Sequence, residues 1–321
     1  MSPRRRNYPL ALGFAGVAAG ATAFAAYRAA RKYRNLELDM SELALPDGLT
    51  RINVTVDDGA TIHGVEIGEG RPIVLLHGVT LSVATWPYQL RKLSEDYRVI
   101  ALDARGHGDT ECNIAGATMG RLASDVAQVM SHLDLRDAIV VGHSMGGMMT
   151  QQMCLDFPDL AKDRIAGTIL LSTAAAPAAS FPGGPRLGRQ MRGGRYAGKG
   201  RTVPPAEIGY ALARLALGAH PDPRFVAHTR DMSGAVPAHI AGEVLPFVVG
   251  FDVRSRLKDY PVPALVISGS RDLLTPPRAG KDLATRIPNA QFEVVPGGGH
   301  MLMMERAGWL NERIDKFARN H

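Results

Sequence analysis

The chain has 321 residues, of which 45% are apolar and 21% charged, a composition that supports a large buried core and excludes a mostly disordered protein. The net charge of +6 comes from the start of the chain. Residues 1–34 hold seven of the 37 basic residues and no acidic one, which leaves 30 basic and 31 acidic residues for the rest. A nearly neutral body gives no support to nucleic-acid binding. Two cysteines are too few for a disulfide scaffold and show no metal-ligand spacing.

The first predicted region, residues 1–46, contains a hydrophobic segment and a polar linker. Residues 8–27 hold no charged side chain, lie between basic clusters and have about the length of a bilayer-spanning helix. We expect them to form a helix that anchors the protein to a membrane as a single span. The high alanine and glycine content leaves a cleaved signal peptide and a soluble helix as alternatives. Because both flanks are basic, the side of the membrane that the body faces stays open.

Residues 47–175 begin with an edge hairpin and continue as alternating strands and helices. Apolar and polar residues alternate in 51–58 and 61–68, on either side of an Asp-Asp-Gly turn. Continuous apolar runs typical of buried parallel strands follow, at "PIVLLHG", "YRVIALD", "AIVVGHS" and "AGTILLST". Amphipathic segments at 82–95 and 118–134 separate several of them. The pattern predicts an α/β protein with a mostly parallel, doubly wound sheet.

Residues 176–258 interrupt this alternation with helical pieces and no strand-like run. Two more apolar runs, "PALVISGS" and "FEVVPGG", then complete the sheet within 259–321. We therefore expect a helical cap inserted between two parts of the core, over the carboxyl ends of the strands, where ligands bind in such sheets. The basic, glycine-rich loop at 186–201 holds no acidic residue, and two interpretations stay open: contact with anionic lipid headgroups, or a solvated flexible loop without a partner.

A serine between glycines follows one of the apolar runs. Residues 140–147 read "VVGHSMGG", and a helical pattern comes next. A strand, a tight turn and a helix around Gly-x-Ser-x-Gly are the context of a strained nucleophilic serine, although an ordinary glycine-rich turn has the same pattern. Ser144 is therefore a candidate nucleophile.

Two later residues can activate this serine. A serine hydroxyl needs a base to take its proton and an acid to orient the base. Asp272 and His300 each follow an apolar run, so the sheet places Ser144, Asp272 and His300 at the carboxyl ends of three strands, in the expected order. Attack on a carbonyl also needs N–H donors for the oxyanion, and chain position predicts the amides of Val79 and Met145.

Five motifs carry a resemblance to a known family. "HGVT", "DARGHG", "GHSMGG", "GSRDLLTP" and "GGGH" occur in the order and spacing of the α/β-hydrolase superfamily, and residues 50–320 resemble its branch of esterases, lipases and cofactor-free haloperoxidases. The resemblance implies the α/β-hydrolase fold, a Ser144–His300–Asp272 triad, and oxyanion donors at Val79 and Met145. It implies a serine hydrolase that cleaves small-molecule or lipid esters through an acyl-enzyme, with no metal and no organic cofactor.

The residues around the predicted site are candidates for the substrate pocket: His77, Gly78, Trp86 and Met301. Histidines pinned in tight turns, such as His77 and His143, are more often scaffold than bases, and a tryptophan on a first helix is more often core than pocket wall. In the family that this chain resembles, the segment 103–108 is usually a structural turn beside the site.

Other functions stay open on the same residues. A perhydrolase would make a peracid on the triad, although such relatives usually carry Trp and Pro where this chain has Val79 and Thr80. Hydrolysis of carbon-carbon bonds is a further possibility, but relatives of that kind often have Asn in place of His143. Outside enzymes, the fold could bind an apolar ligand.

Overall fold

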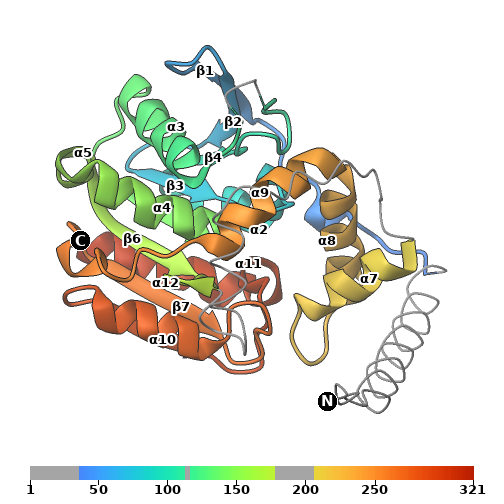
Figure 1. Ribbon diagram of the computed structural model, residues 1–321. Helices are drawn as coiled ribbons and strands as arrows, with labels where there is room; N and C mark the ends of the chain where they lie inside the picture. Colours follow the sequence, from blue (N-terminus) through green and yellow to red (C-terminus); the bar gives the residue numbers. More distant parts are fainter. Residues whose placement is uncertain (1–35, 113–115, 178–205) are drawn as a thin grey trace, which may run out of the picture.

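The computed structural model describes residues 36–112, 116–177 and 206–321 (Figure 1). The predicted anchor and the basic loop lie outside these residues, so membrane association stays a prediction. No single described helix is long and apolar enough to cross a membrane. One bent pair, Pro223–Ala235 with His239–Gly250, passes that test when its two halves are counted together.

The centre of the fold is one sheet, which has eight strands within the described residues. The strand order is β1-β2-β4-β3-β5-β6-β7-β8. β1 pairs antiparallel with β2, and β2 with β4, while all other neighbours are parallel. This confirms the edge hairpin and the mostly parallel sheet. The strands are β1 (Thr50–Thr55), β2 (Thr61–Ile67), β3 (Pro72–Leu76), β4 (Arg98–Leu102), β5 (Ala138–His143), β6 (Ile165–Leu171), β7 (Ala264–Gly269) and β8 (Gln291–Val295).

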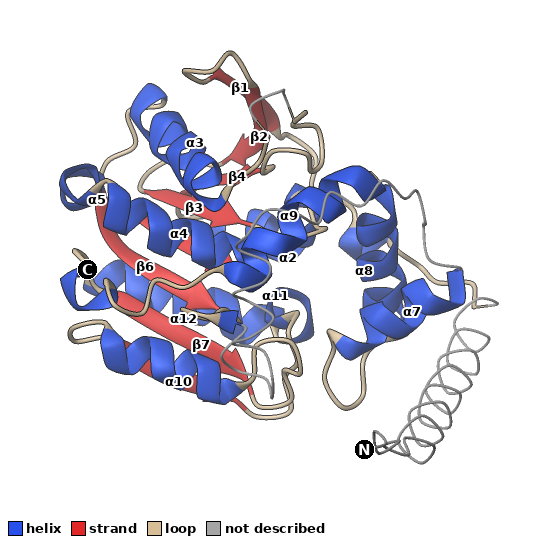
Figure 2. Cartoon of the chain, in the orientation of Figure 1, coloured by secondary structure: helices blue, strands red, loops and turns tan. Residues whose placement is uncertain are grey.

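Helices cover both faces of the sheet, as the doubly wound pattern predicts (Figures 1 and 2). One layer holds α3 (Met119–His132), α4 (Met145–Asp156), α5 (Pro158–Arg164) and α10 (Pro277–Arg286). The other layer holds α2 (Pro87–Leu93), α11 (Leu302–Glu305) and α12 (Ala307–Asn320). Short 3-10 turns lie at Ser41–Leu43, Val83–Thr85 and Leu257–Asp259. The two layers explain why the central strands are apolar on both sides.

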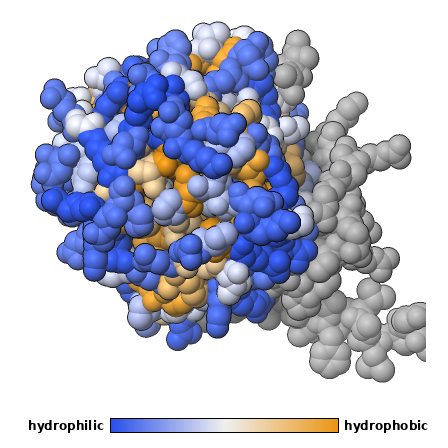
Figure 3. Space-filling model, turned by 90° about the vertical axis from the view of Figure 1, so that its left-hand side faces the viewer, coloured by the Kyte–Doolittle hydropathy of each residue, from blue (hydrophilic) through white to orange (hydrophobic). Residues whose placement is uncertain are grey.

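The core has two parts, separated by the sheet. On β3, Val74 and Leu76 belong to the cluster with α3, α4 and α10, whereas Ile73 and Leu75 belong to the cluster with α2, α11 and α12. Successive side chains of a strand point to opposite faces, so a continuous apolar run is needed to fill both clusters. The face of the molecule shown in Figure 3 is mostly hydrophilic, with smaller apolar areas between the polar residues.

Residues between the two halves of the core form helices, and no strand occurs in the described part of 176–258. The three helices are α7 (Ala206–Leu215), α8 (Pro223–Ala235) and α9 (Ala238–Gly250), and they lie at the end of the sheet toward which β6 and β7 point (Figure 2). Hydrogen bonds tie this region to loops at the carboxyl ends of strands, including Val253 N–H to Ala175 O (3.1 Å) and His300 N–H to Ala216 O (2.8 Å).

Candidate active site

Ser144 lies in a strained turn between β5 and α4. Its backbone has φ 51° and ψ −112°, a conformation that non-glycine residues rarely adopt and that costs on the order of 1–3 kcal/mol. Neighbouring segments hold it there: the Ser144 N–H donates to Leu171 O (3.0 Å), and the Thr173 hydroxyl donates to Ser144 O (2.7 Å). The strain is thus fixed by the ends of adjacent strands, which is the arrangement of a nucleophile turn.

The glycines beside Ser144 are there because no side chain fits. A Cβ on Gly146 would lie 2.2 Å from Leu76 O, and a Cβ on Gly142 would lie 2.5 Å from Gly146 O. A Cβ on Gly78 would lie 3.2 Å from the Ser144 Cβ, so the loop after β3 passes directly over the serine. The glycines are therefore required because three backbone segments, the end of β5, the start of α4 and the loop after β3, approach one another closely.

The structure brings Asp272 and His300 into direct contact. His300 Nδ1 donates to Asp272 Oδ2 at 2.8 Å, and both side chains are buried. The other Asp272 oxygen accepts from the N–H groups of Leu274 and Thr275, each at 2.8 Å. An acceptor at Nδ1 fixes the neutral imidazole as the Nδ1–H tautomer, which leaves Nε2 free to accept a proton.

Ser144 follows β5 and His300 follows β8, two strands separated in the sheet by β6 and β7, so the loop that carries His300 reaches back toward the serine turn. The His143 ring, next to Ser144 in the chain, lies 4.7 Å from the His300 ring, and His143 Nε2 donates to His300 O (2.9 Å). The Ser144 hydroxyl has no hydrogen bond to the described residues, and such contacts are often long in a protein without substrate.

The N–H groups of Val79 and Met145 are free to donate. Neither is hydrogen-bonded within the described part of the chain. Met145 is the first residue of α4, where the helix dipole favours negative charge. Val79 follows Gly78, the residue that lies over Ser144. Both donors therefore flank the serine, as an oxyanion site requires.

Glu305 is a residue of this site that the sequence analysis missed. Its carboxylate accepts from Gly299 N–H (3.1 Å) and Met301 N–H (3.2 Å), on either side of His300, and from Gly218 N–H (2.7 Å), which follows α7. Burial raises the pKa of this carboxyl above its usual value. Glu305 thus connects the His300 loop to the helical cap. The sequence signal that could have indicated it is a single acidic residue directly after the apolar run at 301–304.

The predicted pocket residues are mostly buried. Trp86, His77 and Met301 are at most 1% exposed, and Trp86 and Met301 belong to the core cluster beneath α2 and α12. These side chains offer almost no surface to a ligand in this structure. A cavity of about 230 Å³ lies elsewhere, lined by residues 174–176 with Arg254, Arg278, Ala279 and Asp282, and no predicted site residue lines it. Within the described residues, no cluster of three or more His, Cys, Asp or Glu side chains is placed to hold a metal ion.

Comparisons with known proteins agree with this architecture. The family described as "alpha/beta hydrolase fold" matches residues 71–307. A non-heme haloperoxidase from Rhodococcus erythropolis is 28% identical, with 82% of this chain and 98% of the relative covered. An esterase from Thermogutta terrifontis superposes with a TM-score of 0.72 at 27% identity, covering 84% of this chain and 98% of that one. An enzyme that degrades N-acyl homoserine lactones gives 0.70 at 28%, covering 83% and 100%. The chain therefore belongs to the alpha/beta hydrolase fold family and is a hydrolase of that fold.

Proposed function

We propose that this protein hydrolyses carboxylic esters through an acyl-enzyme formed on Ser144. The observation that carries the proposal is the strained Ser144 turn, which lies at the same sheet edge as the hydrogen-bonded pair His300 and Asp272. The strained backbone at Ser144 lowers the stability of the fold, and a serine acts as a nucleophile only where a base can take its proton. A base oriented by a buried carboxylate gives the serine the partner that nucleophilic catalysis needs.

The reaction proceeds in two halves. Ser144 Oγ attacks the ester carbonyl carbon while His300 Nε2 takes its proton, and Asp272 stabilises the imidazolium that forms. The Val79 and Met145 N–H groups donate to the oxyanion, and His300 returns the proton to the leaving alcohol. Water then attacks the acyl carbon and gives up its proton to His300, which passes it to Ser144 Oγ as the acyl–oxygen bond breaks and the carboxylic acid leaves. One oxyanion donor contributes about 10² to 10³ in rate.

The substrate class is supported by the relatives. Two solved structures of similar fold are an esterase and an enzyme that degrades N-acyl homoserine lactones, and a lactone is a cyclic ester. Simple acyl esters and lactones are therefore the first substrates to test. The haloperoxidase relative supports a second activity, in which hydrogen peroxide replaces water and the acyl group leaves as a peracid.

Labelling with a fluorophosphonate probe tests the proposal. The wild type is expected to label and to hydrolyse p-nitrophenyl esters, with an optimum acyl length, and Ser144→Ala is expected to lose both, by about 10⁴-fold or more in kcat. Peroxide-dependent peracid formation, measured on the same proteins, separates the two activities. Hydrolysis that persists in Ser144→Ala, with the fold intact by circular dichroism, would contradict the proposal.

A further inference from the structure

Two loops at the carboxyl edge of the sheet are joined by histidines, one from each loop. The loop 77–83 follows β3, and the loop 103–110 follows β4. His77, on the first loop, accepts through Nε2 from Ala104 N–H at 3.0 Å. His107, on the second loop, accepts through Nε2 from Thr80 N–H at 3.1 Å. The two rings lie 5.3 Å apart. Each loop thus supplies an imidazole that binds the backbone of the other.

Both imidazoles are fixed as the same neutral tautomer. His77 Nδ1 donates to Gly78 O (2.7 Å), and His107 Nδ1 donates to Arg105 O (2.9 Å). Since a carbonyl can only accept, each Nδ1 carries the hydrogen and each Nε2 presents its lone pair. Burial lowers the pKa of both imidazoles to about 4. Near pH 7 both side chains are neutral, as their acceptor role requires.

These contacts hold the peptide group that carries the Val79 N–H. The carbonyl of that peptide is Gly78 O, which accepts from His77 Nδ1 and from Leu81 N–H (3.2 Å). The next peptide along donates its Thr80 N–H to His107. Thr80 itself has a φ of 58°, an unfavourable value for a threonine, so the turn needs external support. The peptide is held on both sides of Val79.

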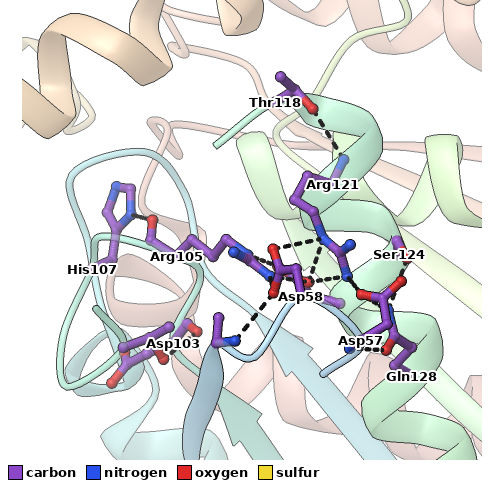
Figure 4. A network of polar contacts seen from close by, with 12 residues as sticks. Asp57, Asp58, Asp103, Arg105, His107, Thr118, Arg121, Ser124 and Gln128 are labelled. Atoms are coloured by element: carbon purple, nitrogen blue, oxygen red, sulfur yellow. Dashed lines mark hydrogen bonds and ion pairs between the residues drawn. The ribbon is translucent and has the colours of Figure 1, made fainter. Parts of the chain in front are cut away.

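The second loop is itself anchored by a buried ion pair (Figure 4). The Arg105 side chain is fully buried, and its guanidinium donates to both oxygens of Asp125 (2.5 and 3.0 Å) and to Asp58 (2.7 Å). The carbonyl of the same residue accepts from His107. A bidentate guanidinium–carboxylate pair restricts orientation as well as distance. The ion pair therefore restricts the backbone at Arg105, and the hydrogen bond from His107 to its carbonyl restricts the His107 ring in turn.

We propose that His107 and His77 are positioning residues for the hydrolysis: they hold the Gly78–Val79 peptide so that its N–H points at the site of the oxyanion over Ser144. This inference rests on the proposed function. The imidazoles never touch the reacting atoms. Their effect is on the orientation of a donor, and displacing a catalytic group by about 1 Å can cost 10²-fold in rate.

Two substitutions at His107 separate its two contacts. In His107→Gln, the side-chain oxygen reaches about the position of Nε2, so it keeps an acceptor for Thr80 N–H. In His107→Asn, the shorter amide reaches about the position of Nδ1, so it keeps only the contact to Arg105 O. The matched control is His132→Asn, at an exposed histidine whose side chain makes no hydrogen bond within the described residues.

The variants are measured in the full chain in two ways. Amide hydrogen exchange reports whether Thr80 N–H is protected, and p-nitrophenyl butyrate hydrolysis gives kcat and KM. For His107→Asn we expect exchange at Thr80 to rise at least about tenfold and kcat to fall about 10- to 100-fold, with KM within about twofold. For His107→Gln we expect both quantities to return to within about fivefold of wild type, and for the control no change.

Equal kcat values for the Gln and Asn variants, with hydrolysis still dependent on Ser144, would overturn the inference and leave the proposed function intact. An unprotected Thr80 amide in the wild type would overturn it as well, without any substrate. Absence of Ser144-dependent hydrolysis in the wild type would instead overturn the proposed function, and with it the positioning role of His77 and His107.

Discussion

The two loops that flank Ser144 are held by different chemistry. The His300 loop is held by carboxylates: Asp272 binds the imidazole, and Glu305 binds the backbone on both sides of it. The turn at Gly78 and Val79 is held by neutral imidazoles whose own partners are backbone groups. A carboxylate partner stabilises an imidazolium, whereas a backbone N–H that donates to Nε2 requires the neutral ring. Under the proposed mechanism, the partner therefore distinguishes His300, which changes charge during the reaction, from His77 and His107, which hold the backbone.

The largest effect expected from this comparison is that of Asp272→Asn. The amide removes the charge that stabilises the imidazolium and favours the wrong tautomer, so kcat should fall about 10⁴-fold with little change in melting temperature. Asp103 is the matched control, because its buried carboxylate accepts hydrogen bonds from backbone N–H groups, those of Val83 and Asp109, within the described residues. Asp103→Asn should lower stability, while kcat per fluorophosphonate-titrated site stays within about tenfold. Equal losses of kcat in Asp272→Asn and Asp103→Asn would show that a carboxylate bound to His300 matters no more than one bound to backbone N–H groups.

Glu305→Gln tests whether the His300 loop depends on a full carboxylate. An amide turns one acceptor into a donor that faces a backbone N–H, so we expect a loss of about 1–3 kcal/mol in unfolding free energy. We also expect a roughly tenfold fall in kcat as His300 shifts. The control is Glu312→Gln, on the exposed side of α12. Urea unfolding and ester hydrolysis measure both effects, and a fall in stability alone would limit Glu305 to a structural role.

The buried neutral imidazoles of His77 and His107 predict a pH dependence of stability. The pKa of His107 is about 4 in the fold and near 6.5 in the unfolded chain, so the unfolded state binds more protons as the pH falls through this window. The free energy of unfolding should decrease from pH 6.5 to 4, by up to about 1.4 kcal/mol per pH unit for each such imidazole. Asp103 and Glu305, whose pKa is raised by burial, act in the opposite direction.

Replacing one imidazole isolates this effect. His107→Gln removes one titrating group, so its stability should fall less steeply than that of the wild type between pH 6.5 and 4. Urea denaturation at half-unit pH steps gives both slopes, and parallel curves would show that His107 does not take up a proton on unfolding.

The smallest effect is expected at His143. Its Nε2 donates to His300 O, and its Nδ1 is buried without a partner among the described residues. Glutamine can keep the donor to His300 O, so His143→Gln should keep kcat within about threefold. His143→Leu loses the donor and leaves a buried carbonyl unpaired, which should cost about 1–3 kcal/mol in stability. A large loss of kcat in the Gln variant would assign His143 a proton-transfer role.

The sequence alone predicted the elements of this fold because its signals are local. Alternating apolar and polar residues marked β1 and β2, continuous apolar runs marked β3 to β8, and the glycines around Ser144 marked a turn where backbone segments meet. Once the parallel sheet was predicted, the carboxyl ends of its strands necessarily gathered Ser144, Asp272 and His300 at one edge. These predictions needed only periodicity and chain order.

The tertiary structure decided what holds that edge together. His77 and His107 find their partners 27 residues away, and Glu305 finds Gly218 at a separation of 87 residues. The local sequence pattern does not predict which buried donor binds which acceptor, because each hydrogen bond depends on how two loops pack after the sheet has formed. Trp86 and Met301 lie in the core for the same reason: the sequence supplies an apolar side chain, and only packing against α12 decides whether it meets solvent, substrate or another side chain.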